Sequence, residues 1–315
     1  MIEVESSFIE LIDSYSSITV LSHINPDADA IGTSLALYTW LKQRGHRVEI
    51  ANKSTDIPRN LKFLINYKKI KNKMDYTDSL IISCDCGSID RLGFDVSGRD
   101  IINIDHHETN TNFGKLNIVD KNAVSSSEVL YRLLCSIGGI TKDISTALYT
   151  ALISDSLNFT TANMPKSIFL LANSLVELGA DPVYISSEMI NSRSLASIRV
   201  LSLALSSLEL SSSGKLATII VNREDLVKSG AIYSDLDGIV DYARSLVTVE
   251  IGLMFVERED DVKVSIRSKS IDISSLANHF GGGGHRNAGG FSMSGVGIAE
   301  LKKLIIDEIK RKGLL

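Results

Sequence analysis

The chain has 315 residues, of which 44% are hydrophobic and 23% charged, a composition typical of a globular protein with two domains. Its 33 Lys and Arg residues are outnumbered by 38 Asp and Glu. The basic stripe that grips long nucleic acid is therefore missing, and any nucleic-acid substrate should be short. The first residues lack the basic and apolar regions of a signal peptide, and no apolar run approaches the ~18 residues of a membrane span. We expect a soluble, cytoplasmic protein that binds neither membranes nor long duplex nucleic acid.

The first half of the chain alternates strands and helices. A β-branched run at Ile18–Ser22 predicts a strand, and helical periodicity over Ala30–Arg44 predicts a helix that ends at Gly45. Further elements follow in order: strands at Val48–Ala51, Ser79–Asp85 and Asp100–Asp105, then helices at Ser127–Ile137 and Ile144–Ser154. The later strands are almost continuously apolar, as strands buried on both faces are. This alternation predicts an α/β fold, with a mostly parallel sheet and helices on both faces.

The second half begins with a Ser-rich helical pattern from Ser187 to Leu210, which Ser211–Gly214 interrupts. We interpret this segment as a connecting helix followed by a hinge. The elements predicted beyond it are strands at Leu216–Val221, Thr248–Val256 and Val262–Arg267, and helices near Ile273–Phe280 and Ile298–Lys310. The sequence therefore predicts three parts: a first domain over residues 1–186, the connecting helix and hinge over 187–214, and a smaller α/β domain over 215–315.

The three cysteines do not indicate a disulfide framework or a thiolate zinc site, because their number is odd and they are not arranged in pairs. Cys84 and Cys86 lie in an apolar run at strand spacing, so we expect both to be buried on one face of a strand.

Histidines and aspartates follow the ends of several predicted elements. Three groups follow strands and one ends a helix: His23 with Asp27 and Asp29, then Asp85, then Asp105 with His106 and His107, and finally Asp155. Ligands of open α/β sheets bind beyond the carboxyl ends of the strands. These side chains are therefore expected to converge on one region.

The chemistry of this set indicates a pair of metal ions. It combines imidazole nitrogens with carboxylate oxygens and contains no thiolate, which suits Mn²⁺, Mg²⁺ or Fe²⁺ better than structural zinc. The set is larger than one ion needs beside water and substrate, whereas two ions that share a carboxylate would use it. Two ions ~3.5–4 Å apart can generate hydroxide and stabilise both the attacking and the leaving oxygen of a phosphoryl displacement. The sequence therefore predicts hydrolysis at phosphorus.

Each of these residues also has a purely structural interpretation. Asp29 could cap the helix that follows it, and Asp27 could stabilise a turn. Asp85 and Asp155 could be ordinary carboxylates at the ends of their elements. The adjacent pair His106 and His107 is harder to explain in this way. The metal hypothesis fails only if the structural interpretation is correct for every one of these residues.

A run of four glycines marks the second domain. Residues 281–284 lack side chains and permit positive φ, so their backbone amides can approach an anion closely, and His285 and Arg286 would add charge or hydrogen bonds. A flexible linker is the alternative, but a predicted helix before the run and an apolar run after it argue against one.

Arg267 ends a strand whose polar residues share one face, and this face could either bind substrate or simply be exposed to solvent. Lys269 is left unassigned.

The order and spacing of these groups resemble the DHH phosphoesterases. The family's four motifs correspond to His23-Ile24-Asn25-Pro26-Asp27-Ala28-Asp29-Ala30-Ile31-Gly32, Asp85, Asp105-His106-His107 and Asp155. Residues 281–290, with the sequence GGGGHRNAGG, resemble the signature of the DHH-associated domain of one subfamily. The resemblance covers almost the whole chain and is greatest to the bacterial group of nanoRNases and 3′-phosphoadenosine-5′-phosphate phosphatases.

The resemblance implies a role for each residue. The metal ligands would form two sets: His23, Asp27 and Asp85 for one ion, and Asp29, His106 and Asp155 for the other, with Asp85 bridging. Asp105 would orient an imidazole, as metal-bound histidines generally require, and His107 would contact the scissile phosphate as an electrophile or proton donor. The implied substrate-binding residues lie in the second domain: Arg267, Gly282, Gly283, Gly284 and His285. The ions are usually Mn²⁺ in this family, with Mg²⁺, Co²⁺ and Fe²⁺ as alternatives.

Two positions depart from the usual pattern of the family. Ala28 stands where Gly is common, and Asp155 is followed by Ser-Leu-Asn-Phe where the family often has Thr-Gly. The ligand is kept in the second case, but its hydroxyl neighbour and the loop shape differ, which leaves the details of substrate fit open.

The function that the resemblance implies is hydrolysis of RNA of a few nucleotides and of 3′-phosphoadenosine 5′-phosphate. The second domain would hold one end of the substrate. A phosphodiesterase for cyclic di-AMP or its linear product is a near alternative with the same two domains. A non-catalytic nucleotide sensor is an alternative of another class, which an exchanged metal ligand would favour, but none is exchanged. Family members are often dimers, although no feature of the sequence demands it.

Overall fold

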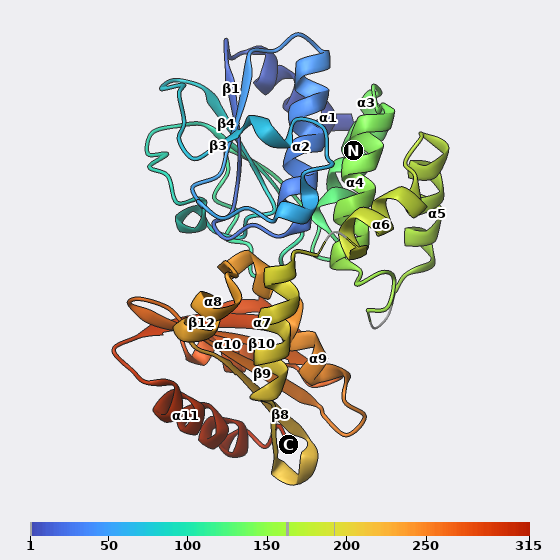
Figure 1. Cartoon of the computed structure of the whole chain (residues 1–315). Helices are drawn as coiled ribbons and strands as arrows, with labels where there is room; N and C mark the ends of the chain where they lie inside the picture. Colours follow the sequence, from blue (N-terminus) through green and yellow to red (C-terminus); the bar gives the residue numbers. More distant parts are fainter. Residues whose placement is uncertain (1, 162–163, 192) are drawn as a thin grey trace. The chain divides into compact units, whose positions relative to one another are not determined.

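The structure is a computed structural model that describes residues 2–161, 164–191 and 193–315 (Figure 1). It divides into two compact units, residues 1–192 and 193–315. Each unit contains its own six-stranded sheet and its own hydrophobic clusters.

The first unit is built on a parallel sheet with the strand order β3-β2-β1-β4-β5-β6. Its strands are β1 (Ile18–Ser22), β2 (Val48–Ala51), β3 (Ile70–Lys71), β4 (Leu80–Cys84), β5 (Ile101–Asp105) and β6 (Leu116–Val119). The four strands expected from apolar runs are present, whereas the short β3 and the half-buried β6 gave no such signal. From β1 the chain reaches β2 on one side and β4 on the other, so a switch point of the kind that binds ligands lies between β1 and β4.

The helices of the first unit carry the larger part of its core. They are α1 (Ile2–Asp13), α2 (Ala28–Gln43), α3 (Ser126–Ile137), α4 (Lys142–Asp155), α5 (Lys166–Glu177) and α6 (Pro182–Asn191). Figure 1 shows α2, α3 and α4 side by side, in agreement with their mutual contacts. No described helix is by itself long and apolar enough to cross a membrane; α5 and α6 would pass such a test only together, and the chain bends by 103° between them.

The two faces of this sheet are covered differently. One face packs on the α-helices, in a cluster that joins strand residues such as Val20 and Ile82 to helix residues such as Leu152. The other face packs on a smaller cluster that contains Leu21 and Leu92. Leu92 belongs to the short 3-10 helix η3 (Ile89–Leu92). The parallel α/β architecture is confirmed, with α-helices on one face and the 3-10 helix η3 among the segments that cover the other.

Cys84 and Cys86 are both buried, but in different clusters. The strand ends at Cys84, and Asp85 has a φ of +55°, which interrupts the alternation of side chains. The expectation that the two cysteines share one face is therefore wrong. Burial raises the pKa of both thiols, that of Cys86 to about 12, so both stay protonated.

The second unit contains a mixed sheet with the strand order β11-β12-β10-β9-β8-β7. Its strands are β7 (Glu209–Ser211), β8 (Leu216–Val221), β9 (Ile251–Glu257), β10 (Asp261–Ser268), β11 (Gly283–His285) and β12 (Ala288–Ser294). Strands β8 and β9 are parallel, and the other neighbours are antiparallel.

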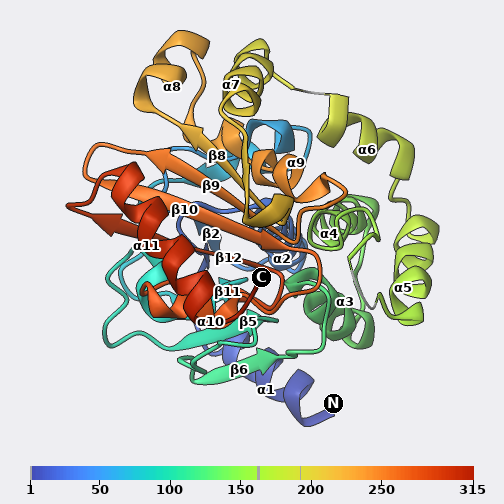
Figure 2. The same ribbon diagram turned by 90° about the horizontal axis from the view of Figure 1, so that it is seen from below.

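Helices cover both faces of the second sheet. They are α7 (Leu195–Ser206), α8 (Arg223–Ser229), α9 (Ile239–Ser245), α10 (Ser274–His279) and α11 (Ile298–Arg311). Residues of α7, α8 and α9 share one hydrophobic cluster, and residues of α10 and α11 share another. Figure 2 shows α11 crossing the strands of this sheet.

The described part of the structure does not contain the single connecting helix and the hinge that were expected over residues 187–214. This range contains the end of α6, the whole of α7 and the strand β7, and the compact units divide between residues 192 and 193. Ser194 begins α7 as its N-cap, because its hydroxyl accepts a hydrogen bond from the Ser197 amide at 2.9 Å. Ser211, expected in a hinge, pairs with Leu216 of β8 and belongs to the second sheet. The prediction failed because α6 and α7 are both Ser-rich and follow each other closely, so their combined pattern resembles one long helix.

Candidate metal centre

The expected convergence of side chains is present at the carboxyl ends of β1, β4 and β5, which are neighbours in the sheet. His23 follows β1, Asp85 follows β4, and Asp105 is the last residue of β5. Three further groups come from helix ends and from the residues after β5: Asp27 and Asp29 at the start of α2, His106 and His107, and Asp155 at the end of α4. Because all strands of this sheet run the same way, their polar ends meet at one edge.

One group of ligand atoms surrounds His23. Its Nε2 lies 3.4 Å from Oδ2 of Asp85 and 3.9 Å from Oδ2 of Asp27. The other oxygen of Asp27 accepts from the Ala30 amide at 3.0 Å and caps α2. The helix therefore starts two residues earlier than expected, and Asp27, not Asp29, is its N-cap. A single carboxylate can cap the helix with one oxygen and offer the other to a cation.

A second group surrounds His106. Its Nε2 lies 3.2 Å from Oδ2 of Asp155, 3.7 Å from Oδ1 of Asp85 and 3.9 Å from Oδ2 of Asp29. Asp85 thus presents one oxygen to His23 and the other to His106. This is the arrangement that a bridging carboxylate requires.

Asp29 is fixed by a distant part of the chain. Its two oxygens accept hydrogen bonds from the backbone amides of Ser126 (2.7 Å) and Ser127 (3.1 Å), in the first turn of α3, and Thr33 Oγ1 donates to Oδ1 at 3.0 Å. Amides at a helix N-terminus favour a negative charge. Asp29 is fully buried, so α3 orients the carboxylate toward the centre with little freedom.

Both candidate ligand histidines are oriented by a backbone carbonyl. Nδ1 of His23 lies 2.8 Å from the carbonyl oxygen of Ile24, and Nδ1 of His106 lies 3.2 Å from that of Ala123. If each Nδ1 carries the proton, each Nε2 keeps its lone pair for a cation. The Nε2 atoms are the ones that face the carboxylates.

His107 is arranged differently from His106. Its Nδ1 lies 2.7 Å from Oδ1 of Asp105, and Asp105 also accepts from Asn110 Nδ2 at 2.5 Å. Asn110 in turn donates to Asn103 at 2.7 Å. The two asparagines are buried and were missed by the sequence analysis. The available signal was Asn103, a polar residue inside the apolar strand β5.

Protons and cations compete for this centre. Burial raises the pKa of Asp29 well above its ordinary value, and the charges of Asp85 and Asp155 raise it further. Burial likewise raises the pKa of Asp155 to about 6. Burial would also raise the pKa of Asp85, but a hydrogen bond with His23 and the nearby imidazoles hold it well below its usual range. Burial lowers the pKa of His106, but its contact with Asp155 raises it well above the ordinary value. Metal uptake should therefore release protons.

The residues fit divalent metal ions. Three groups have ligand atoms within 4.8 Å of one another: His23, Asp27 and Asp85; Asp29, His106 and Asp155; and Asp85, His106 and His107. All the donors are nitrogen or oxygen, the set that Mn²⁺, Mg²⁺ and Fe²⁺ accept. In the described part of the chain these carboxylates form ion pairs with histidines and not with Lys or Arg. Their negative charge is therefore left for cations to neutralise.

We expect Ser126→Ala to weaken metal binding without unfolding the protein. The Ser126 hydroxyl donates to Oδ1 of Asp85 at 2.9 Å, while its amide, which binds Asp29, is unaffected by the change. Loss of an orienting hydrogen bond to a ligand typically costs about 10- to 100-fold in metal affinity. Titration calorimetry with Mn²⁺ measures it. Ser127→Ala is the matched control, since its hydroxyl contacts Ser125 instead. Equal affinities in the two variants would contradict the expectation.

The predicted substrate residue Arg267 lies in the second unit. Its side chain is about a quarter exposed, and its Nε lies 3.9 Å from Oδ1 of Asp241. Arg244, which the sequence analysis did not select, lies 3.1 Å from the same oxygen. Lys269 donates to the carbonyl oxygens of Leu246 and Val247 at 2.6 and 3.0 Å, a structural contact.

The glycine run is partly a strand and not a free loop. Gly283 and Gly284 pair with Gly290 and Gly289 in an antiparallel hairpin. A Cβ at Gly284 would lie 2.3 Å from the carbonyl oxygen of Ala288, so packing alone excludes a side chain there. A Cβ at Gly283 would meet nothing within 4 Å. The side chain of His285 lies outside the described part of the structure.

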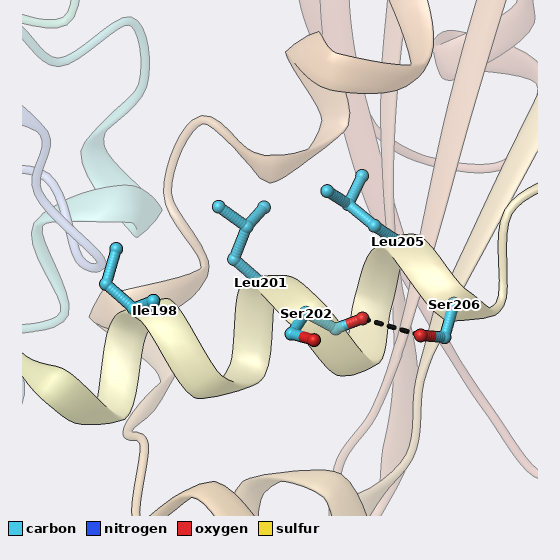
Figure 3. Close-up of a pocket in the computed structure, with 5 residues that line it drawn as sticks. All are labelled: Ile198, Leu201, Ser202, Leu205 and Ser206. Atoms are coloured by element: carbon cyan, nitrogen blue, oxygen red, sulfur yellow. Dashed lines mark hydrogen bonds between the residues drawn. The ribbon is translucent and has the colours of Figure 1, made fainter.

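A hollow on α7 is lined by residues that provide no acid, base, carboxylate or imidazole for phosphoester hydrolysis. Its lining residues are Ile198, Leu201, Ser202, Leu205 and Ser206. Figure 3 shows the three apolar side chains on one side of the helix and the hydrogen bond between the two serines. None of the lining residues is titratable at neutral pH.

Comparison with known families identifies both units. Residues 17–153 match the DHH family, N-terminal domain, and residues 215–311 match the DHHA1 domain. The chain therefore contains the N-terminal domain of the DHH family and a DHHA1 domain, and it is a hydrolase that acts on phosphoester bonds.

Several characterised or solved proteins are similar to the chain over most of its length. The chain is 28% identical to the bifunctional oligoribonuclease and PAP phosphatase NrnA of Thermus thermophilus, over 94% of this chain and 90% of that protein. It is 25% identical to the cyclic-di-AMP phosphodiesterase PdeA of Listeria monocytogenes, over 95% of this chain but 48% of that protein. The solved structure of an exopolyphosphatase-related protein from Bacteroides fragilis has a TM-score of 0.86 and 26% identity, and the match covers 99% of this chain and 97% of that one.

Proposed function

We propose that this protein uses two Mn²⁺ ions to hydrolyse phosphoester bonds in very short RNA and in 3′-phosphoadenosine 5′-phosphate. The observation that carries the proposal is the position of Asp85, whose two oxygens face His23 and His106, each within a separate group of ligand atoms. Similarity to the oligoribonuclease and PAP phosphatase NrnA over most of both chains supports the substrate class.

Each residue of the candidate centre would have a distinct role in metal binding or catalysis. His23, Asp27 and Asp85 would bind one ion, and Asp29, His106 and Asp155 the other, with Asp85 shared. When bound, two such ions supply a nucleophilic hydroxide and stabilise the attacking and leaving oxygens. Asp105 holds His107 by Nδ1, so that the ring can contact the scissile phosphate as an electrophile or proton donor.

The proposal is tested by turnover across a panel of nucleotides with added Mn²⁺. The panel contains RNA of two to about five nucleotides, 3′-phosphoadenosine 5′-phosphate, cyclic di-AMP, its linear dinucleotide, and a long duplex RNA as negative control. We expect turnover of the short RNA and of 3′-phosphoadenosine 5′-phosphate. Higher kcat/KM for cyclic di-AMP or its linear product would favour the alternative that similarity to PdeA raises. Absence of turnover, together with nucleotide binding, would favour a sensor.

The second unit would bind the substrate through Arg267, Gly282, Gly283, Gly284 and His285. Gly283 is the position at which this can be tested without damage to the hairpin, because an added methyl group would meet no atom of the chain within 4 Å. We expect Gly283→Ala to raise KM about tenfold while the melting temperature stays unchanged, since the methyl group would keep the phosphate from the backbone amides.

Two other glycines serve as controls for this variant. Gly297→Ala should change neither KM nor stability, because that position is equally open and has a φ of −80°. Gly282→Ala should lower the melting temperature, because its Cβ would lie 2.1 Å from the Gly290 carbonyl oxygen. Unchanged KM in Gly283→Ala would remove Gly283 from the substrate-binding residues.

A further inference from the structure

An arginine outside the expected ligand set lies beside the metal centre. Arg91 belongs to η3, and its Nη2 lies 3.1 Å from Nδ1 of His23. The backbone joins the same two segments, because the Ile24 amide donates to the Arg91 carbonyl oxygen at 2.8 Å. Gly93 packs so closely on Ile24 that a Cβ added to Gly93 would lie 2.6 Å from Cγ2 of Ile24. The turn that carries Arg91 is therefore fixed against the loop that carries His23.

Arg91 cannot keep its hydrogen bond to Nδ1 of His23 when His23 is a metal ligand. A guanidinium can only donate hydrogen bonds, so Nδ1 would have to accept from it. The same Nδ1 lies 2.8 Å from the Ile24 carbonyl oxygen, which can only accept. His23 that binds a cation through Nε2 keeps its proton on Nδ1 and donates it to Ile24. Arg91 then has no acceptor on the imidazole.

The guanidinium needs another acceptor in that state. In the part of the chain that the structure describes, no carboxylate forms an ion pair with Arg91, and the residue is partly buried. A partly buried guanidinium is most stable with an oxyanion that accepts two of its donors. The anion that this enzyme class brings to the metal centre is a phosphoryl group.

We propose that Arg91 binds a phosphoryl oxygen of the substrate, and of the phosphate that is released, beside the group of His23, Asp27 and Asp85. This inference rests on the proposed function and extends it. The substrate-binding residues expected from the sequence all belong to the second unit, whereas Arg91 would add a cationic phosphate-binding side chain to the first unit, in addition to His107. Metal binding by His23 and phosphate binding by Arg91 would then be coupled.

The test compares the full-length protein with Arg91→Met and Arg91→Lys by titration calorimetry. Each protein is titrated first with Mn²⁺ and then, when loaded, with inorganic phosphate. We expect Arg91→Met to bind phosphate about 10- to 100-fold more weakly, the usual effect of losing a hydrogen bond to a charged group, with Arg91→Lys in between. Affinity for Mn²⁺ should stay equal or rise, because a neighbouring positive charge is removed.

Arg47→Met is the matched control. Arg47 directly precedes β2, at the opposite end of the strands, and its guanidinium lies over the ring of Tyr76 at 4.7 Å. This variant should bind Mn²⁺ and phosphate as the unchanged protein does.

Three results would overturn the proposal. One is phosphate affinity in Arg91→Met within twofold of the unchanged protein, and another is no phosphate binding by the unchanged Mn²⁺-loaded protein. The third is an affinity for Mn²⁺ that falls together with that for phosphate, because Arg91 would then only support His23. These measurements need no turnover. A protein that binds phosphate through Arg91 but hydrolyses no nucleotide would contradict the proposed function alone.

Discussion

Asp85→Asn should lower turnover of short RNA and of 3′-phosphoadenosine 5′-phosphate by roughly three orders of magnitude or more. The change removes the carboxylate whose two oxygens face both candidate metal groups. Asn is the informative replacement, because Asp85 has a φ of +55°, a conformation that Asn adopts more readily than Ala. Steady-state kinetics and metal content by elemental analysis measure the effect.

Asp90→Asn is the control for this variant. Asp90 is an exposed carboxylate in η3, only a few residues after the same strand, so it tests whether loss of any nearby charge is sufficient. We expect it to retain turnover and metal. Near-normal turnover of Asp85→Asn with full metal content would defeat the assignment of Asp85 as the shared ligand, and with it the two-metal proposal.

His107→Asn should lower kcat about 10²- to 10⁴-fold and leave the metal content intact. The shorter side chain can still reach Asp105, which lies 2.7 Å from Nδ1 of His107, but it lacks the atom that would contact the scissile phosphate. His106→Asn should instead lose metal, because Nε2 of His106 faces Asp155 and Asp85. The two adjacent histidines are therefore distinguished by metal content and not by activity alone.

The pH profile adds a second measurement for His107. Burial lowers its pKa, but the hydrogen bond with Asp105 and the charge of Asp85 raise it more, so the pKa lies above its ordinary value of 6.5. If the protonated ring is the active form, kcat is full below this pKa and falls as the pH rises through it. His107→Asn should lose that alkaline limb, while His46→Asn, a change just before the amino end of β2 and so at the opposite end of the strands, should keep it. A profile unchanged in His107→Asn would exclude the proton-donor role.

The site was accessible from the sequence because of one property of parallel sheets. Their strands end at a common edge, so residues that follow strands meet whatever lies between them in the chain. His23, Asp85 and His106 follow separate apolar runs, and the structure brings them within reach of one another. The ligand chemistry needed no structure either, since the odd number and the spacing of the cysteines already argue against a thiolate site.

The contacts that orient the centre could not be read from the sequence. Asp29 accepts from the amide of Ser126, 97 residues away, and Ser126 also donates to Asp85. No periodicity connects such pairs, because their contact depends on how α3 packs against the sheet. The break between α6 and α7 was missed for a related reason: which core a helix joins is decided by packing and not by its own pattern.

The sequence by itself determined the class of this protein: a parallel α/β unit whose strand ends carry a metal-binding set of histidines and aspartates, followed by a smaller unit with a glycine-rich segment. Only the tertiary structure decided which oxygen of Asp85 faces which histidine, that the glycines form a tight hairpin, and that Arg91 lies against His23. The positions of the strands along the chain follow from local apolar patterns, whereas these contacts follow from hydrogen bonds and close packing between segments that are distant in the chain.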